Sequence, residues 1–272
     1  MNASGSDTAF AGSIPEFYDH YLVPLIFEPY AADLARRVVT LGPTRVLEIA
    51  AGTGVVTRAM AKALPVHVDV VATDLNPPML DYAAAVGTQR PVRWQQADAM
   101  RLPFDDAGFD VVVCQFGAMF FPDKARAFAE ARRVLRRGGV LLFNVWDRIE
   151  ENEFADVATT ALAGLYPADP PRFMARTPHG YFDRAAIARD LAHAGFDTAP
   201  RIETVAARSR AESARVPAVA YCQGTPLRNE IEARAGAGLA AATSACADAI
   251  AARFGAGPVD GKIQAHVVTA EN

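Results

Sequence analysis

The sequence has few cysteines, little net charge and no long hydrophobic run, and each shortage excludes a class of protein. Its three cysteines among 272 residues show no spacing typical of a disulfide framework or a metal site, which favours a reducing compartment. The formal net charge of −4 gives no electrostatic footprint for nucleic acid. Since no apolar run approaches the length of a bilayer span, we expect a soluble, cytoplasmic protein without nucleic-acid or membrane partners.

The rest of the composition is that of a globular protein. Hydrophobic residues make up 51% of the chain and charged residues 21%, enough to bury a sizeable core as one large domain or a domain with an insert. Residues 1–12 are small and polar and lack the features of a signal peptide, so we expect them to be disordered. The five histidines lie far apart and none forms a pair at metal-ligand spacing, so no metal is expected.

The most informative segment is a glycine-rich stretch at residues 46–57, VLEIAAGTGVVT, which joins an apolar run to a helical pattern. Glycines such as Gly52 and Gly54 let the backbone turn sharply and let a ligand approach the main chain. The helix that follows offers unpaired N–H groups and the positive end of its dipole. An open α/β sheet binds a nucleotide-like ligand in this way, although dinucleotide enzymes use a similar loop.

Two acidic residues follow at the ends of the next apolar runs. Asp74 ends the run 66–73, about twenty residues after the glycines, where a carboxylate can accept hydrogen bonds from both hydroxyls of a ribose. Asp98 ends the run 92–97, and the segment 102–110, LPFDDAGFD, leads into a further apolar strand. Any one of these acids is readily explained as a strand-end turn residue. The glycine-rich stretch, Asp74, and Asp98 with the segment 102–110, in this order and spacing, are not readily explained by turns alone.

The rival interpretation is a dinucleotide-binding enzyme. Such enzymes place a third glycine three residues after the second, where helix and strand pack closely. Counted from Gly52 and Gly54, that position is Thr57. Dinucleotide enzymes do not require the segment 102–110 either, so both mismatches argue against an NAD(P)-dependent oxidoreductase.

On these motifs the chain resembles the class I S-adenosylmethionine (SAM)-dependent methyltransferases, in particular the branch of the ubiquinone and menaquinone biosynthesis C-methyltransferases. The resemblance covers residues 44–146 well and 181–196 more loosely. It implies an enzyme that uses S-adenosyl-L-methionine, forms S-adenosyl-L-homocysteine and transfers a methyl group to a small-molecule acceptor by direct in-line attack. A non-catalytic SAM-binding protein stays as an alternative, and a homodimer stays open.

The resemblance also implies which residues bind the cofactor. The loop beside the methionine part of the cofactor comprises Glu48, Ala50, Gly52, Thr53 and Gly54. Asp74 would hold the ribose, Leu75 would line the adenine pocket, and Asp98 would bond the adenine amino group beside the Ala99 backbone. Gln115 and Phe116 would flank the methionine part and the methyl donor. One departure stands out, because the first glycine of the family's loop is Ala50 here.

A second motif, Asn76-Pro77-Pro78-Met79, is misleading. It resembles the Asn-Pro-Pro-aromatic motif of methyltransferases that act on planar nitrogens, but it follows the second strand instead of the fourth, and methionine replaces the aromatic residue. Asn76 is expected to cap the next helix and Pro77 to occupy its first turn. Met79 stays among the candidate cofactor contacts.

From residue 45 the chain alternates strands and helices, the pattern of a parallel sheet with helices on both faces. The predicted strands span 45–50, 67–73, 92–97, 109–115, 139–146, 201–208 and 262–269, and the predicted helices span 54–64, 77–86, 123–136, 150–166 and Asp183 to Gly195. Gly138 and Gly139 are expected to stop the helix 123–136. The predicted fold is a Rossmann-like, doubly wound, seven-stranded sheet.

The resemblance adds that the last strand runs antiparallel to an otherwise mostly parallel sheet. Between the last two strands lies an alanine-rich segment, 211–256, with high helix propensity. We expect it to be a helical cap over the acceptor side. The N-terminal segment, residues 1–42, is expected to be helical with breaks at Pro24 and Pro29, ahead of a methyltransferase domain at 43–272.

The acceptor side is less clear from sequence. A small, fairly apolar acceptor is preferred because phenylalanine, tyrosine and methionine are frequent at the expected borders of the site. If the acceptor is a hydroxyl or a carbon acid, a base must remove its proton. The candidate catalytic residues are His20, His179 and Tyr181, and histidine leads because its ordinary pKa lies near neutrality. Tyr21, like Tyr18, is a candidate for orienting the cofactor instead.

Overall fold

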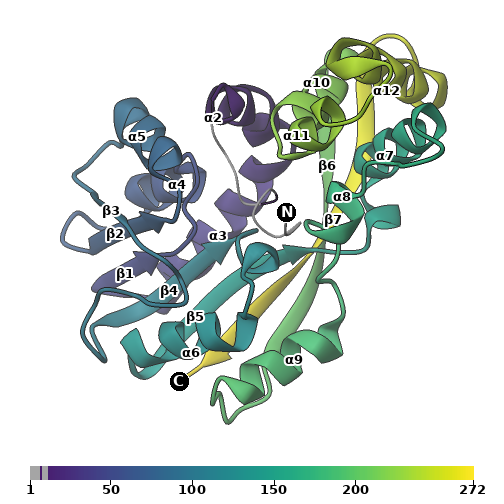
Figure 1. Ribbon diagram of the computed structural model, residues 1–272. Helices are drawn as coiled ribbons and strands as arrows, with labels where there is room; N and C mark the ends of the chain where they lie inside the picture. Colours follow the sequence, from purple (N-terminus) through teal and green to yellow (C-terminus); the bar gives the residue numbers. More distant parts are fainter. Residues whose placement is uncertain (1–6, 8–11) are drawn as a thin grey trace. The chain divides into compact units, whose positions relative to one another are not determined.

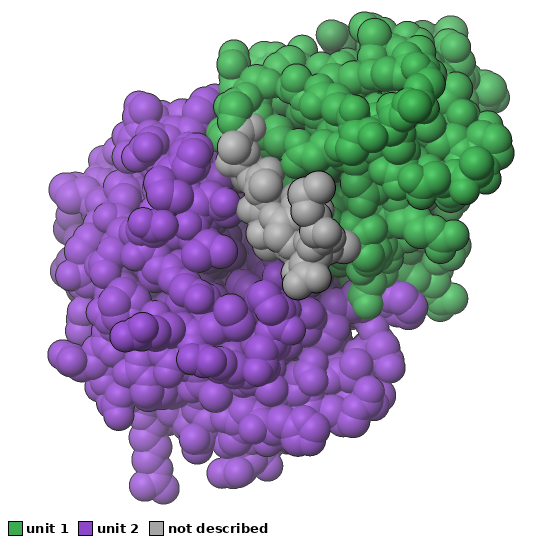
Figure 2. Space-filling model, viewed as in Figure 1, with its two compact units in different colours: residues 1–27, 146–180, 206–264 green, residues 28–145, 181–205, 265–272 purple. Residues whose placement is uncertain are grey.

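The computed structural model describes residue 7 and residues 12–272 (Figure 1). The expected disorder of residues 1–12 therefore concerns positions that, Asp7 and Gly12 apart, lie outside the described residues. The chain divides into two compact units, coloured separately in Figure 2. Unit 2 holds residues 28–145, 181–205 and 265–272, and unit 1 holds the described residues up to Phe27 together with 146–180 and 206–264.

A seven-stranded sheet has the strand order β3-β2-β1-β4-β5-β7-β6. Its strands are β1 (Arg45–Glu48), β2 (Asp69–Asp74), β3 (Arg93–Gln96), β4 (Phe109–Gln115), β5 (Leu135–Trp146), β6 (Arg201–Ala211) and β7 (Val259–Glu271). The strands from β3 to β5 pair in parallel. After β3 the chain crosses to the other side of β1, so the strand order reverses between β1 and β4. In open α/β sheets this switch point is where ligands bind.

The last strand is antiparallel to β5. Asn272 exchanges backbone hydrogen bonds with Gly138 and Gly139 near the start of β5, whereas Asp147, just past its end, donates to the Gln264 carbonyl at 3.0 Å. The pairing moves backwards along β7 as it moves forwards along β5, which is the antiparallel sense. The predicted seven-stranded, mostly parallel sheet with an antiparallel last strand is confirmed.

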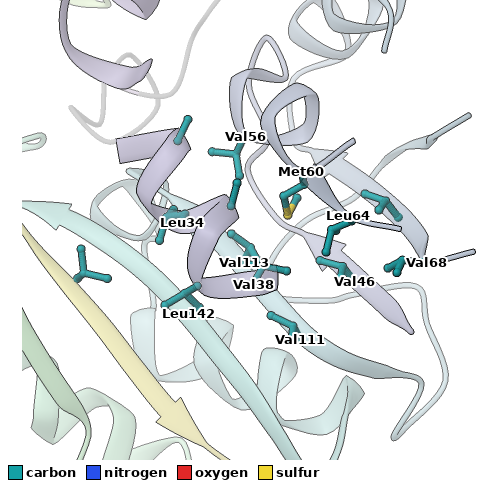
Figure 3. Packing of buried hydrophobic residues seen from close by; sticks show 14 residues of the cluster. Leu34, Val38, Val46, Val56, Met60, Leu64, Val68, Val111, Val113 and Leu142 are labelled. Carbon is teal, nitrogen blue, oxygen red and sulfur yellow. The ribbon is translucent and has the colours of Figure 1, made fainter. Parts of the chain in front are cut away.

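The helices of unit 2 cover both faces of the sheet. They are α3 (Glu28–Leu41), α4 (Val55–Ala63), α5 (Pro77–Val86), α6 (Lys124–Val134) and α9 (Arg184–His193), with a short turn η2 (Ala118–Phe120). On one face, Leu34 and Val38 of α3 and Met60 of α4 pack on strand residues such as Val113 (Figure 3). On the other face, Phe128 of α6 packs on Phe143 of β5, with ring centroids 5.0 Å apart.

The boundary between α6 and β5 differs from the prediction. The helix ends at Val134, and Gly138 and Gly139 lie within the strand instead of stopping the helix. The register between β4 and β5 shifts after Phe109, as it does at a bulge. A Cβ on Gly139 would stand 3.0 Å from the Asp110 carbonyl oxygen, so glycine is needed there for close approach of two strands.

The N-terminal segment is helical without the predicted breaks. α2 (Ile14–Phe17) continues into a π-helix, η1 (Tyr18–Phe27), and then into α3. Pro24 lies inside η1, where it cannot donate a backbone hydrogen bond, yet the helix continues through it. Pro29 lies in the first turn of α3, and the helix continues through it from η1.

Unit 1 also contains the helical insertion between β6 and β7. The helices of the insertion are α10 (Arg215–Gln223), α11 (Leu227–Glu232) and α12 (Gly238–Phe254). Unit 1 further holds α7 (Glu153–Leu165), α8 (Phe173–Arg176) and a short turn η3 (Ile149–Glu151), which precede β6. The predicted helical nature of the insertion is thus confirmed. α10 packs on η1 and α12 packs on α7, so the insertion forms much of the core of unit 1.

The cysteines hold one feature that their spacing did not reveal. All three are buried free thiols. Two of them, Cys222 of α10 and Cys246 of α12, nevertheless bring their sulfur atoms to 3.6 Å. Helix packing, not sequence spacing, creates this proximity.

Candidate cofactor site

The glycine-rich loop connects β1 to α4 at the strand-order switch point. Its backbone enters the left-handed region at Gly52 (φ 57°) and Gly54 (φ 84°), where side chains are disfavoured. A Cβ on Gly54 would also meet the Trp94 ring at 2.8 Å and the Ala83 methyl at 3.2 Å, so this glycine allows the loop to pack on β3 and α5. A Cβ on Gly52 would lie 3.6 Å from the Met79 methyl group, which places Met79 beside the loop.

Ala50, the residue that replaces the family's first glycine, adopts φ 54°. An alanine in the left-handed region costs roughly 1 kcal/mol. A Cβ added to Gly117, which follows β4, would lie 2.4 Å from the Ala50 Cβ and 2.8 Å from the Cys114 sulfur. The methyl group of Ala50 therefore occupies space that excludes a side chain at Gly117, and the two positions are coupled.

This coupling gives a double-mutant prediction. Ala50→Gly relieves backbone strain, which raises the free energy of unfolding, but it also gives the unfolded chain more freedom, which lowers it. The expected net gain is up to about 1 kcal/mol. Gly117→Ala is expected to destabilise by about 1–3 kcal/mol through overpacking, and by less when Ala50 is already glycine. Urea unfolding of the four chains tests this. An equal cost of Gly117→Ala in both backgrounds would show that the methyl group is not the obstacle.

The carboxylate of Asp74 is oriented by backbone donors. The Gly52 N–H donates to one oxygen at 2.8 Å, and the Asn76 N–H donates to the other at 2.8 Å. Burial raises the pKa of Asp74, and these hydrogen bonds act in the opposite direction. The oxygen bonded to Gly52 retains a second lone pair, whereas the other oxygen also receives the Asn76 side-chain amide at 3.3 Å. The carboxylate is thus held in a fixed orientation against the glycine-rich loop, with capacity for further donors.

The predicted helix cap at Asn76 is wrong. Asn76 precedes α5, but its side chain makes no capping hydrogen bond. Its amide donates instead to Asp74 at 3.3 Å, which adds a third donor around that carboxylate. Pro77 occupies the first turn of α5 as predicted.

Glu48 lies at the end of β1 and is 1% exposed. Its carboxylate accepts a hydrogen bond of 2.5 Å from Thr57 of α4. Burial raises the pKa of Glu48 to about 8, opposed by the Thr57 hydrogen bond and the charge of Arg58. Thr57 therefore occupies the position where a dinucleotide enzyme needs its third glycine, and its buried hydroxyl donates a hydrogen bond to Glu48.

The residues expected around adenine lie at the ends of β2 and β3. Leu75 is 50% exposed, and its carbonyl accepts a 3.0 Å hydrogen bond from the Gln96 side chain. The Asp98 side chain accepts a hydrogen bond from the Met100 N–H at 2.9 Å, and the Asp98 backbone carbonyl accepts one from the Arg101 N–H at 2.9 Å. Ala99 lies within this turn, so the two strand ends carry Leu75, Asp98 and Ala99 next to Asp74.

The strand register aligns four polar side chains. Glu48 pairs with Val113 of β4, two residues before Gln115, and Gln115 pairs with Asn144 of β5. Asp74 ends β2 on the other side of β1. Side chains two residues apart share a face, so these four lie on the face covered by α3 and α4. The result is a polar row at the carboxyl ends of β2, β1, β4 and β5.

Asn144 is the member of this row that the sequence prediction missed. Its side-chain oxygen accepts a 2.9 Å hydrogen bond from the Phe116 N–H. Phe116 itself adopts φ 51° and packs edge-on against Tyr30, with centroids 5.3 Å apart. One signal was available, because Asn144 is the only polar residue in the run 140–146, VLLFNVW.

The candidate bases differ in their surroundings. In unit 2, the Tyr181 hydroxyl donates to Asp190 at 2.6 Å, and burial raises its pKa, so it stays protonated near neutral pH. In unit 1, His179 is buried, and its Nδ1 lies 2.8 Å from the Asp147 carbonyl oxygen. Burial lowers the pKa of His179 to about 4. His20 is exposed and stands edge-on to Tyr21 in the same unit, with centroids 4.6 Å apart.

The loop and the polar row fit a charged nucleoside ligand. The Thr53 hydroxyl, between the two glycines, is buried and has no hydrogen-bond partner among the residues that the structure describes. Together with the Asp74 carboxylate it supplies fixed polar groups of the kind that such a ligand satisfies. Across residues 7 and 12–272, no group of three or more His, Cys, Asp or Glu side chains could hold a metal ion, and no helix there is long and apolar enough to cross a membrane.

Known proteins share this region. A family profile described as a methyltransferase domain matches residues 47–143. The ubiquinone/menaquinone biosynthesis C-methyltransferase UbiE of Cupriavidus necator is 34% identical over 165 residues, which cover 56% of this chain and 67% of that protein. The demethylmenaquinone methyltransferase of Deinococcus radiodurans is 38% identical over 129 residues, 40% of this chain and 53% of that protein. The chain thus spans about half the length of the first curated relatives it matches.

Solved structures agree on the fold. A SAM-dependent methyltransferase of Thermotoga maritima aligns with a TM-score of 0.51 and 14% identity, covering 95% of this chain and 97% of that one. The [4+2]-cyclase SpnF aligns with a TM-score of 0.55 and 20% identity, covering 90% of this chain and 81% of that one. The presence of a cyclase among these neighbours shows that the fold alone does not fix the chemistry.

Sequence family and fold together define the class: the chain belongs to the class I SAM-dependent methyltransferases. Within that class, it is similar to the branch of the ubiquinone and menaquinone biosynthesis methyltransferases. The cofactor of the class is S-adenosyl-L-methionine.

Proposed function

We propose that this protein transfers a methyl group from S-adenosyl-L-methionine to a small-molecule acceptor. The observation that carries the proposal is the Asp74 carboxylate, held by the Gly52 and Asn76 N–H groups against the glycine-rich loop. A buried carboxylate at this position, with a lone pair left on the oxygen bonded to Gly52, suits a ribose hydroxyl. Among the alternatives, NAD(P)-dependent oxidation has no support, because Thr57 fills the space of the glycine it needs.

The cofactor supplies a methyl carbon on a positively charged sulfur, which is already an excellent leaving group. The protein's task is then to position the acceptor and to exclude water. Asp74 would bind the ribose, Leu75, Asp98 and Ala99 the adenine, and Glu48, Ala50, Gly52, Thr53 and Gly54 the methionine part. Met79 would support the loop, and Gln115 and Phe116 would flank the reacting end, with Tyr21 as a further candidate contact.

For the acceptor we propose a quinol related to the substrates in the names of the relatives. Those proteins are called demethylmenaquinone and ubiquinone/menaquinone methyltransferases. An aromatic, largely apolar quinol agrees with the small, apolar acceptor expected from the sequence. The buried free thiols of the three cysteines suit a reducing cytoplasm, where we place this activity.

Calorimetry and turnover test the proposal together. S-adenosylmethionine and S-adenosylhomocysteine are expected to bind, and NAD is not expected to bind comparably. With a short-chain demethylmenaquinol as probe, the chain should release S-adenosylhomocysteine and a product heavier by one methylene. Tight NAD binding, or cofactor binding without turnover of any acceptor tried, would favour the oxidoreductase or the non-catalytic alternative instead.

If the acceptor must lose a proton, the base comes from His20 or His179, because the Tyr181 hydroxyl donates to Asp190 and stays protonated. A base works in its deprotonated form, so with a pKa near 4 His179 would give a kcat that is flat from pH 6 to 9 and falls only in acid. His20→Ala and His179→Ala should be assayed across this range with the quinol probe. If both keep full kcat and an unshifted profile, positioning alone accounts for the catalysis.

We further propose that α10, α11 and α12 cover the acceptor. Removing them would strip buried residues such as Leu227 and Ile250 from the core of unit 1, so excision is a poor test. Hydrogen–deuterium exchange avoids this problem. Residues 215–254 are expected to gain protection with S-adenosylhomocysteine plus quinol and not with S-adenosylhomocysteine alone. Equal protection by the cofactor product alone would contradict a role confined to the acceptor.

A further inference from the structure

The side chain of Asn144 points to the face of the sheet that α3 and α4 cover. Its neighbour Phe143 packs on α6, on the opposite face. Leu142, two residues before Asn144, belongs to the cluster formed with α3 and α4 (Figure 3). Since side chains alternate along a strand, Asn144 lies on the same face as Leu142. Its register partner Gln115 extends the polar row that begins at Asp74.

Only half of the Asn144 amide is used within the protein. The Phe116 N–H donates to its oxygen, which fixes which end of the amide is the carbonyl. The amide nitrogen is buried and makes no hydrogen bond among residues 7 and 12–272, and Asn144 as a whole is 0% exposed. Native proteins seldom bury a donor in this way, and exceptions concentrate where a ligand or a bound water completes the hydrogen bond.

The same contact holds a strained residue. Phe116 has φ 51°, a conformation that bulky side chains rarely adopt. Strain of this kind persists where the surroundings enforce it, and it clusters at ligand sites. The Phe116 N–H donates to the side-chain oxygen of Asn144 at 2.9 Å and also to its backbone oxygen at 3.2 Å, so Asn144 positions the end of β4 in addition to presenting its own amide nitrogen.

We propose that Asn144 recognises an oxygen atom of the molecule held at the carboxyl ends of β4 and β5. Its NH₂ group donates to that oxygen, while its carbonyl keeps Phe116 in place. The oxygen belongs either to the amino-acid carboxylate of the cofactor or to the methyl acceptor, since both are oxygen acceptors suited to one amide donor. This inference rests on the proposed function, which supplies the molecules concerned.

The decisive variant is Asn144→Asp. It keeps a carbonyl-type oxygen for the Phe116 N–H and replaces the NH₂ donor with an acceptor, which repels a ligand oxygen. The matched control is Gln89→Glu, an exposed residue just after α5, which makes the same change from an amide to a carboxylate away from the site. If Asn144→Asp does not fold, Asn144→Ser replaces it, because its hydroxyl is too short to reach the same ligand atom. Thermal unfolding reports the stability of each variant.

Two binding probes and one kinetic probe distinguish the sources of the oxygen. S-adenosylhomocysteine carries the amino-acid carboxylate, and 5′-methylthioadenosine lacks it. Should Asn144 bind that carboxylate, the variant loses at least tenfold in affinity for the first and none for the second. Should Asn144 bind the acceptor, both affinities stay within twofold, while kcat/KM for the short-chain demethylmenaquinol falls at least tenfold.

Other outcomes overturn the inference. If both affinities and kcat/KM stay within twofold of wild type, the amide nitrogen recognises nothing. If both adenosine ligands weaken equally and in step with the melting temperature, Asn144 is a structural residue only. Failure of the wild-type chain to bind S-adenosylhomocysteine would instead defeat the proposed function, so the two failures remain distinct.

Discussion

Replacing Asp74 with alanine is expected to weaken the binding of S-adenosylhomocysteine by about one to two orders of magnitude. A hydrogen bond to a charged group contributes roughly 1.5–3 kcal/mol, and 1.4 kcal/mol corresponds to a factor of ten. The loss should be seen by calorimetry at pH 7. The effect should extend to 5′-methylthioadenosine, because that ligand keeps the ribose.

The control must separate ligand contacts from the shape of the loop. Asp74 also accepts the Gly52 and Asn76 N–H bonds, so its removal frees two loop donors. Asp74→Asn preserves one oxygen acceptor and is expected to lose less affinity than alanine. Asp81→Ala, on exposed surface of α5, makes the same charge change away from these donors. Unchanged affinity in Asp74→Ala would contradict the assignment of this carboxylate to the ribose.

Much of the fold was predictable because its signals are local. The alternation of apolar runs with helical patterns predicted the positions of the first five strands along the chain, and the glycines at 52 and 54 marked the turn between strand and helix. The α6–β5 boundary was missed because a pair of glycines is typical of a helix stop. Here Gly139 serves instead the close approach of two strands, a property of the register that no local pattern contains.

The residues proposed to bind the cofactor could be named from sequence for the same reason. Asp74 and the loop residues are marked by motifs, whereas Asn144 gains its meaning from the strand beside it and from the strained Phe116. The pairing of Cys222 with Cys246 likewise depends on how two helices pack. Contacts of this kind between distant segments require the three-dimensional structure.

Glu48 gives the largest expected effect on stability, and its sign depends on pH. Burial raises its pKa from 4.5 to about 8 in the folded protein. Between these values the folded chain keeps a proton that the unfolded chain loses, so the free energy of unfolding falls as pH rises from about 4.5 to 8 and levels off above. A tenfold change in a proton-binding constant corresponds to about 1.36 kcal/mol, which sets an upper limit of roughly 5 kcal/mol for the total change.

Glu48→Gln removes the titration and retains an oxygen that can accept the Thr57 hydrogen bond. Relative to this variant, wild type is therefore expected to lose stability steadily from pH 5 to pH 8 in urea unfolding. Glu130→Gln is the matched control: Arg133 lowers the pKa of Glu130, so its contribution should be constant above about pH 5. The difference in free energy of unfolding between wild type and Glu48→Gln could instead be constant from pH 5 to 8. That result would contradict the raised pKa and would mean that Glu48 is ionised throughout, stabilised by the charge of Arg58.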